Sequence, residues 1–209
     1  MRRTLREVAK NGVTQVGALE TPPFIEDVLV AMDERNELTV RVAATITGAG
    51  DEMRDWRPWL DWAREHRAPS PHVRVLGFKG YMDGSLGSRT AGMHEPYEDN
   101  HLAEDKAADN AGYPLAMAGT GELGELIQVA ADMNLQPAVH AIGDRANHVL
   151  MNWYAALEPA ERAAVRPRIE HAQHLLPGDV RRFAELGVIP SMQPLHKADD
   201  GRYAEQRLG

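Results

Sequence analysis

The feature that most constrains the fold is a regular alternation of segments with a helical pattern and segments with an extended pattern. In the helical segments apolar residues recur every three or four positions, and short runs rich in β-branched residues lie between them. Because strands separated by helices are joined by crossover connections, this order predicts a parallel sheet covered by helices. It indicates an α/β fold, either a barrel or a doubly wound sheet. The expected strands are 13–19, 38–47, 72–79, 135–143, 165–173 and 188–194.

The expected helices lie between these strands and each presents one apolar face. Residues 120–134, for example, align leucine, isoleucine and alanine side chains along one side of a helix. Pro58 predicts a kink or an interruption in another helix. The expected helices are 4–12, 22–37, 51–67, 120–134, 144–157 and 177–187.

The longest segment without a periodic pattern is 80–118, which is rich in Gly, Asp, Asn and Pro. Loops of this length inside a compact domain usually have a function. No linker or repeat interrupts the alternation, so we expect residues 1–209 to form one partial barrel domain with this loop inserted at a strand end. A closed (β/α)8 barrel has eight strand–helix units, and the pattern shows about six of them.

The composition argues against several classes of function. A formal net charge of −8 does not suit a nucleic-acid or anionic-membrane partner, which would need a basic surface. The absence of cysteine excludes disulfides, thiolate metal sites and a cysteine nucleophile, and it is consistent with a reducing compartment. No window is apolar enough for a membrane span, and the charged N-terminus does not have the apolar core of a signal peptide. We therefore expect a cytoplasmic protein that acts on a small molecule.

Three successive strands end on side chains that can bind a metal or act as a base: Lys79, His140 and His171. In parallel α/β folds, ligands bind at the C-terminal ends of the strands. Taken singly, each residue has a structural explanation, because a strand-end histidine is more often hydrogen-bonded within the protein and a lysine can reach solvent. Their convergence from neighbouring strands predicts a site.

A lysine at a strand end serves two chemistries. In a Schiff-base enzyme, burial lowers the pKa of the lysine so that the neutral amine of Lys79 would attack a carbonyl. A metallohydrolase needs another species, because an ammonium group has no lone pair for a metal. Reaction with CO₂ converts the amine into a carbamate, which is a carboxylate on a long arm, and flanking histidines complete the metal site. His140 and His171 on the next two strands favour the metal interpretation.

Four motifs occur in order between residues 79 and 196: KGYMDGSLGSRTAG, VHAIGDRAN, RIEHAQ and SMQPLH. Together they resemble the YtcJ-like branch of the amidohydrolase superfamily, which includes the N-substituted formamide deformylases. The resemblance implies a (β/α)8 TIM-barrel fold and a metal-dependent hydrolase of amide or related C–N bonds. By position it implies that Lys79 is a carboxylated lysine and that His140 and His171 are metal ligands, with Zn²⁺ as the expected divalent metal.

The sequence departs from the family pattern at both ends. The family's His-x-His pair would precede residue 1, and its metal-binding, proton-accepting Asp would follow residue 209. The small β-sandwich domain that the family builds from both termini is also missing. We therefore expect an internal fragment that forms one metal position at most and leaves the general base unassigned.

Five further residues are candidates for substrate binding at the same end of the sheet. Arg89 could bind a carboxylate or a carbonyl oxygen, although a structural ion pair explains it equally well. Asp83 could instead be a turn residue. The candidates are Asp83, Ser88, Arg89, His174 and Gln193.

Two other interpretations stay open. The chain could be a catalytically incomplete barrel fragment, completed by homo-oligomerisation through its exposed edge strands. It could also be a Schiff-base enzyme that uses Lys79, which the neighbouring histidines make the weaker alternative. Activity on N-formyl or simple amide substrates would exclude the incomplete fragment, and bound metal would exclude the Schiff-base enzyme.

Overall fold

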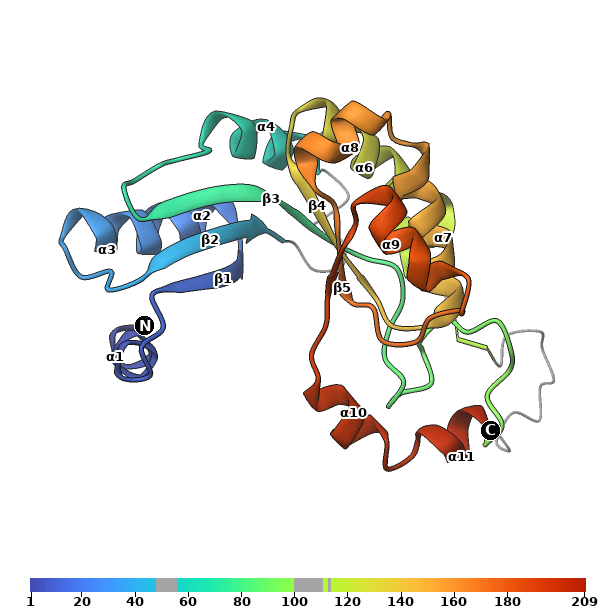
Figure 1. Cartoon of the computed structure of the whole chain (residues 1–209). Coiled ribbons are helices and arrows are strands. Elements are labelled where there is room, and N and C mark those ends of the chain that lie inside the picture. The colour runs from blue at the N-terminus through green and yellow to red at the C-terminus, as the bar shows by residue number, and fades with distance from the viewer. Residues whose placement is uncertain (48–55, 100–110, 113) are drawn as a thin grey trace. The chain divides into compact units, whose positions relative to one another are not determined.

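Figure 1 shows the chain as a computed structural model. The structure describes residues 1–47, 56–99, 111–112 and 114–209. The chain divides into two compact units. The first comprises Met1–Lys79 and Asp132–Gln136, and the second comprises Gly80–Ala131 and Pro137–Gly209.

The first unit is built on three parallel strands that follow one another in chain order. Val42 of the middle strand is in register with Val16 on one side and with Val73 on the other. Alternate residues of the middle strand, Val42, Ala44 and Ile46, are buried, as the β-branched pattern predicts for a covered sheet. The strands are β1 (Gln15–Glu20), β2 (Arg41–Ile46) and β3 (Val73–Tyr81).

The segment predicted as one helix at 22–37 forms a continuous helical run with a π-helical part in its middle. Pro22 and Pro23 occupy its first turn, where the missing N–H groups would have no helical partner. The Thr21 hydroxyl caps this turn by accepting a hydrogen bond from the Phe24 N–H at 3.4 Å. The helices of this unit are α1 (Arg2–Lys10), α2 (Pro22–Phe24), η1 (Ile25–Val30), α3 (Ala31–Glu34) and α4 (Arg57–Glu65).

Pro58 lies in the first turn of α4. Proline is tolerated there because the first N–H groups of a helix have no intrahelical acceptor. The predicted interruption is therefore the beginning of the helix. Residues 51–55, the predicted start of this segment, lie outside the described residues.

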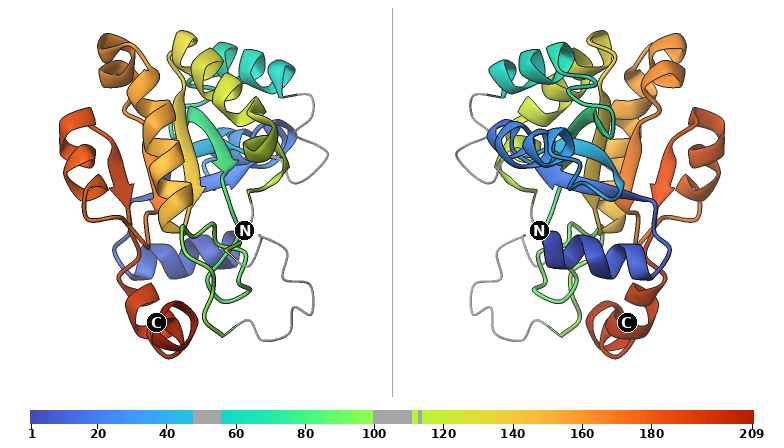
Figure 2. Two further views of the ribbon diagram at one scale, coloured as in Figure 1. Left: turned by 90° about the vertical axis from the view of Figure 1, so that its right-hand side faces the viewer. Right: turned by 90° about the vertical axis from the view of Figure 1, so that its left-hand side faces the viewer.

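The second unit also contains three parallel strands in chain order. Ile169 of the middle strand is in register with Val139 and with Pro190. The strands are β4 (Gln136–Ala141), β5 (Arg168–His171) and β6 (Ile189–Ser191). The adjoining helices α7 (Asp144–Ala156) and α9 (Asp179–Leu186) lie side by side (Figure 2).

Three short helices of this unit were not predicted. They contain 7, 6 and 5 residues, which is no more than two turns and too short to show a helical period. They are α8 (Pro159–Val165), α10 (Leu195–Asp200) and α11 (Ala204–Leu208). The predicted helix at 120–134 corresponds to α6 (Glu122–Asp132). A further short helix that was not predicted, α5 (Ala116–Thr120), begins within the segment 80–118 and is separated from α6 by Gly121 at φ 86°.

The strand β5 is shorter than the predicted strand at 165–173. Arg166 has φ 51°, and His171 and Ala172 have φ 75° and 44°. These left-handed conformations are incompatible with extended backbone, so they limit the strand to four residues. The backbone therefore turns sharply at His171, a predicted site residue.

The described part of the loop at 80–118 has a small apolar core of its own. Leu86, Met93 and Tyr97 are buried in it, and Leu208 of α11 packs against this cluster. The Tyr97 hydroxyl donates a hydrogen bond to the Ala91 carbonyl at 2.8 Å. Burial, with a contribution from the Asp83 carboxylate, raises the pKa of Tyr97 to about 12, which keeps the hydroxyl protonated as a donor.

Six parallel strands in chain order with helical connections make this an α/β fold of the TIM-barrel type, as the sequence predicted. The strand order of a doubly wound sheet reverses at a switch point, so that alternative is excluded. Among the helices that the structure describes, none is long and apolar enough to cross a membrane.

Candidate active site

Lys79 is buried near the end of β3, with 3 % of its surface exposed. A lysine that reaches solvent, the simplest alternative for this residue, is therefore excluded. Burial of an ammonium group in a protein is costly unless the group is paired or neutral. The membership of Lys79 in a metal site stays a prediction.

The second unit brings His140 and His171 together. His140 lies one residue before the end of β4 and His171 ends β5, and their ring centroids are 4.6 Å apart with the planes at 71°. His196, in α10, stacks on His171 at a centroid distance of 5.4 Å. Three imidazole rings therefore gather beyond the C-terminal ends of adjacent strands. His196 follows the last predicted strand, 188–194, by two residues, so its sequence position also indicates this end of the sheet.

The hydrogen bond of His140 fixes its tautomer. The Nε2 atom of His140 lies 2.7 Å from the carbonyl oxygen of Gly84. A carbonyl oxygen only accepts, so Nε2 carries the proton, and in the neutral form of the ring Nδ1 carries the lone pair. His140 can therefore offer Nδ1 to a ligand while Gly84 holds the ring in place.

Asp83 is buried, with 1 % of its surface exposed. Its carboxylate accepts hydrogen bonds from the backbone N–H groups of Gly92, Ile142 and Gly143 at 2.9, 3.0 and 2.8 Å. The same carboxylate lies 3.3 Å from His140 Nε2. These contacts join the loop to the turn after β4, the strand that contains His140. The geometry therefore gives Asp83 a structural role.

Ser88 and Arg89 are also engaged within the loop. The Ser88 hydroxyl lies 2.9 Å from the Ser85 hydroxyl and 2.6 Å from that of Thr90. Arg89 binds Asp99 with both ends of its guanidinium group, at 2.8 and 2.7 Å. The structural ion pair, which was the alternative for Arg89, is what the structure contains.

A pocket of about 430 Å³ adjoins His171. The two remaining candidates, His174 and Gln193, line it together with His196 and Asp200. Burial lowers the pKa of His174 against the opposing effect of nearby carboxylates, which favours the neutral imidazole. The pocket therefore combines imidazole rings with the Asp200 carboxylate, Lys197 and apolar side chains.

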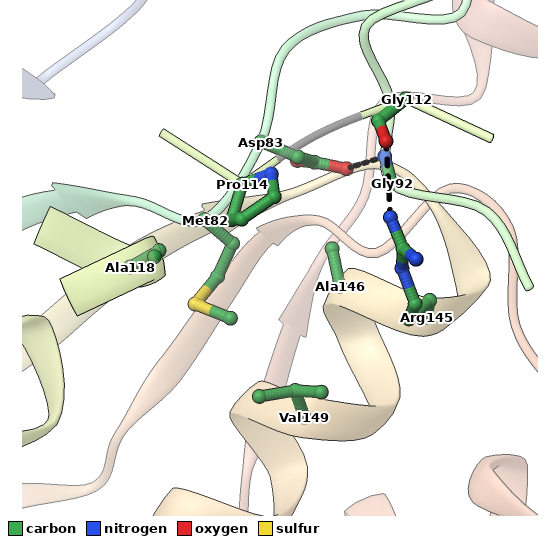
Figure 3. A pocket seen from close by; sticks show the side chains of 10 residues that line it. Met82, Asp83, Gly92, Gly112, Pro114, Ala118, Arg145, Ala146 and Val149 are labelled. Atoms are coloured by element: carbon green, nitrogen blue, oxygen red, sulfur yellow. Dashed lines mark hydrogen bonds between the residues drawn. The ribbon is translucent and has the colours of Figure 1, made fainter. Parts of the chain in front are cut away.

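A second pocket, of about 460 Å³, lies between the loop and α7 (Figure 3). Met82, Ala146 and Val149 form its apolar wall, and the Arg145 guanidinium donates to the Gly112 carbonyl at 3.0 Å.

Within the ranges that the structure describes, no three His, Asp or Glu side chains are arranged to hold a metal ion. His140 and His171 fit a metal such as Zn²⁺, because imidazole nitrogens are common zinc ligands and the two rings are adjacent. The assignment of Lys79 to the same ion stays a prediction.

The sequence profile of the Amidohydrolase family matches residues 1–209. The chain is 38% identical over 134 residues to Protein LONG AFTER FAR-RED 3 of Arabidopsis thaliana, covering 64% of this chain and 21% of that protein. It is 30% identical over 148 residues to the putative amidohydrolase YtcJ of Bacillus subtilis strain 168, covering 71% of this chain and 26% of that protein. The chain thus spans 21% and 26% of the lengths of these relatives.

Two solved structures are similar over the whole chain. An uncharacterized metal-dependent hydrolase from Pyrococcus furiosus matches with a TM-score of 0.77 and 28% identity, covering 100% of this chain and 40% of that one. A second, from Pyrococcus horikoshii OT3, matches with a TM-score of 0.77 and 25% identity, covering 100% and 38%. Because the family profile matches residues 1–209 and the structure has an α/β barrel topology, this chain belongs to the amidohydrolase family.

Proposed function

We propose that this chain supplies one metal position of a hydrolase that acts on amide or related C–N bonds, N-substituted formamides among them. The observation that carries the proposal is the pair of imidazole rings, His140 and His171, 4.6 Å apart at adjacent strand ends in a chain of the amidohydrolase family. The proposed substrate is a small-molecule amide.

The proposed ligands are Lys79, His140 and His171. The buried amine of Lys79, once neutral, forms a bond to the carbon of CO₂ and loses a proton, which yields a carbamate with two acceptor oxygens. His140 and His171 add neutral nitrogens. A divalent metal bound there supplies a Lewis acid for a carbonyl oxygen and lowers the pKa of a water molecule.

The other residues of the chain are proposed to orient the substrate and the ligands. His174 lines the pocket beside His171 and, as a neutral ring, can contact an amide substrate. The carboxylate of Asp83 and the loop that follows it hold the ring of His140 through Gly84. We assign the proton-accepting group to no residue of this chain, because the resemblance places it after the last strand of the barrel.

The test is the metal content of the purified chain, measured by mass spectrometry after preparation with Zn²⁺ and bicarbonate. We expect about one metal ion per chain, in line with a three-ligand site. Lys79→Ala, His140→Ala and His171→Ala should each lose it. His66→Ala is the matched control, because His66 stacks on Trp62 in the first unit and contacts none of the proposed ligands. Stoichiometric metal in any of the three ligand variants would contradict the site.

A second measurement addresses the reaction. Metal-loaded chain is incubated with N-formyl amines and simple amides, and amine release is compared with that of Lys79→Ala. Release above this control supports hydrolysis by the chain itself. Bound metal without release would show that these residues form a metal position that is not sufficient for catalysis.

A further inference from the structure

The ring of His171 is oriented by an unusual backbone conformation. His171 and Ala172 have φ angles of 75° and 44°, in the left-handed region that residues other than glycine seldom adopt. Such conformations persist where surrounding contacts determine them, and they cluster at functional sites. Here the turn brings the His171 ring to Gln193, which follows the neighbouring strand β6 by two residues.

The hydrogen bonds of Gln193 determine which way its amide faces. Its Nε2 donates to the carbonyl oxygen of Ser191 at 3.2 Å. Because that oxygen only accepts, the nitrogen end of the amide must face Ser191. The oxygen end, Oε1, then faces Nδ1 of His171 at 2.7 Å.

This orientation determines the tautomer of His171. An amide oxygen only accepts, so Nδ1 must carry the proton and Nε2 the lone pair. A neutral histidine side chain in water favours the other tautomer, with the proton on Nε2. His171 therefore needs a partner that selects the Nδ1–H form, and Gln193 is placed to be that partner.

We propose that Gln193 is a positioning residue that holds His171 in its Nδ1–H tautomer, so that Nε2 is the nitrogen that His171 offers to a metal. This assigns Gln193 a role different from the substrate contact that the sequence suggested. The tautomer is a property of the metal-free chain, and only its consequence for metal binding rests on the proposed function.

The test uses long-range proton–nitrogen NMR spectra of the whole chain, metal-free and with labelled histidine, at a pH where His171 is neutral. His171→Ala identifies the His171 signals. Gln193→Met removes the acceptor and keeps the length of the side chain, whereas Gln193→Glu keeps an acceptor oxygen. Met192→Leu, at an exposed neighbouring position, is the matched control.

In the wild type and in Met192→Leu we expect a protonated Nδ1 and an unprotonated Nε2. Gln193→Met should shift the population toward Nε2–H, and Gln193→Glu should restore Nδ1–H. Zn²⁺ affinity should fall about 10- to 100-fold in Gln193→Met and less in Gln193→Glu. A wild-type His171 with the proton on Nε2 would overturn the proposal without any variant, and so would an unchanged tautomer in Gln193→Met.

The two proposals fail in different ways. Suppose that His171 is in the Nδ1–H form, that this form depends on Gln193, and that the wild type binds no metal. The positioning role of Gln193 then stands, and only the metal site is refuted. If metal binds but the tautomer does not depend on Gln193, the site stands and the positioning role is refuted.

Discussion

The Asp83 carboxylate accepts a hydrogen bond from the Gly143 N–H at 2.8 Å, which joins a loop to a turn 60 positions later in the chain. Two more backbone N–H groups, those of Ile142 and Gly92, bind the same carboxylate. Because all these groups are buried, removal of the carboxylate leaves donors without acceptors. We expect Asp83→Ala to lower the free energy of unfolding by about 3 kcal/mol or more, and Asp83→Asn by less, since one acceptor oxygen remains.

Urea unfolding of the two variants measures this difference. Asp199→Ala is the control, because its carboxylate is 56% exposed in a loose ion pair with Arg202 at 3.6 Å. It should change the free energy of unfolding by about 0.5 kcal/mol or less. An Asp83→Ala protein as stable as the control would show that the loop does not depend on this carboxylate.

Gly143 is required by the close approach of two backbones. A Cβ atom at this position would lie 2.1 Å from the Gly92 carbonyl oxygen, which belongs to the backbone and cannot rotate away. We expect Gly143→Ala to cost about 1–3 kcal/mol in the free energy of unfolding. Gly178→Ala is the matched control, since a Cβ atom added there would meet no atom within 4 Å. Equal unfolding midpoints for the two variants would refute the steric argument.

The sequence predicted that His140 and His171 lie close together. His140 and His171 end adjacent parallel strands, and strands of this kind place their C-terminal ends at one edge. The alternation of patterns alone was sufficient to place both residues there. His196 follows the last predicted strand by two residues, which also indicates this edge of the sheet, but its helix of six residues is too short to give a period that orients the ring.

The roles of the loop residues could not be read from the sequence. The partners of Asp83 are backbone groups 59 and 60 positions away, which only the tertiary structure brings close. No side-chain pattern indicates such partners, so the sequence left Asp83 as either a substrate contact or a turn residue. Similarly, the tautomer of His140 depends on the carbonyl oxygen of Gly84, and that of His171 depends on the orientation of the Gln193 amide.

The ionisation of Asp33 makes the free energy of unfolding depend on pH. Its carboxylate, 7% exposed, accepts hydrogen bonds from the N–H and the Nδ1 of His72 at 2.9 and 2.7 Å. Burial opposes ionisation, but the nearby Ser70 hydroxyl and the hydrogen bonds from His72 outweigh it and lower the pKa of Asp33 below its ordinary value of 3.8. A group with a lowered folded pKa stabilises the fold above its unfolded pKa, and this contribution disappears as the pH falls.

We therefore expect the free energy of unfolding to decrease as the pH falls below about 4, and Asp33→Asn to remove part of that dependence. Urea unfolding at a series of pH values measures the slope. Asp27→Asn, which changes an exposed carboxylate on the same helical run, should leave the slope unchanged. The same slope in Asp33→Asn as in the wild type would exclude Asp33 as its source.

The two possible roles of Arg89, a structural ion pair and a substrate contact, predict opposite results for its removal. Its guanidinium group binds Asp99 through two hydrogen bonds, and these bonds lower the pKa of the Asp99 carboxyl. A substrate carboxylate would have to displace Asp99 from this pair. We expect Arg89→Ala to lower the melting temperature by about 2–4 °C and to leave the metal content and KM unchanged. Arg64→Ala, at a 52% exposed position paired with Asp61, is the control for loss of a surface charge. A raised KM with an unchanged melting temperature would instead make Arg89 a substrate contact.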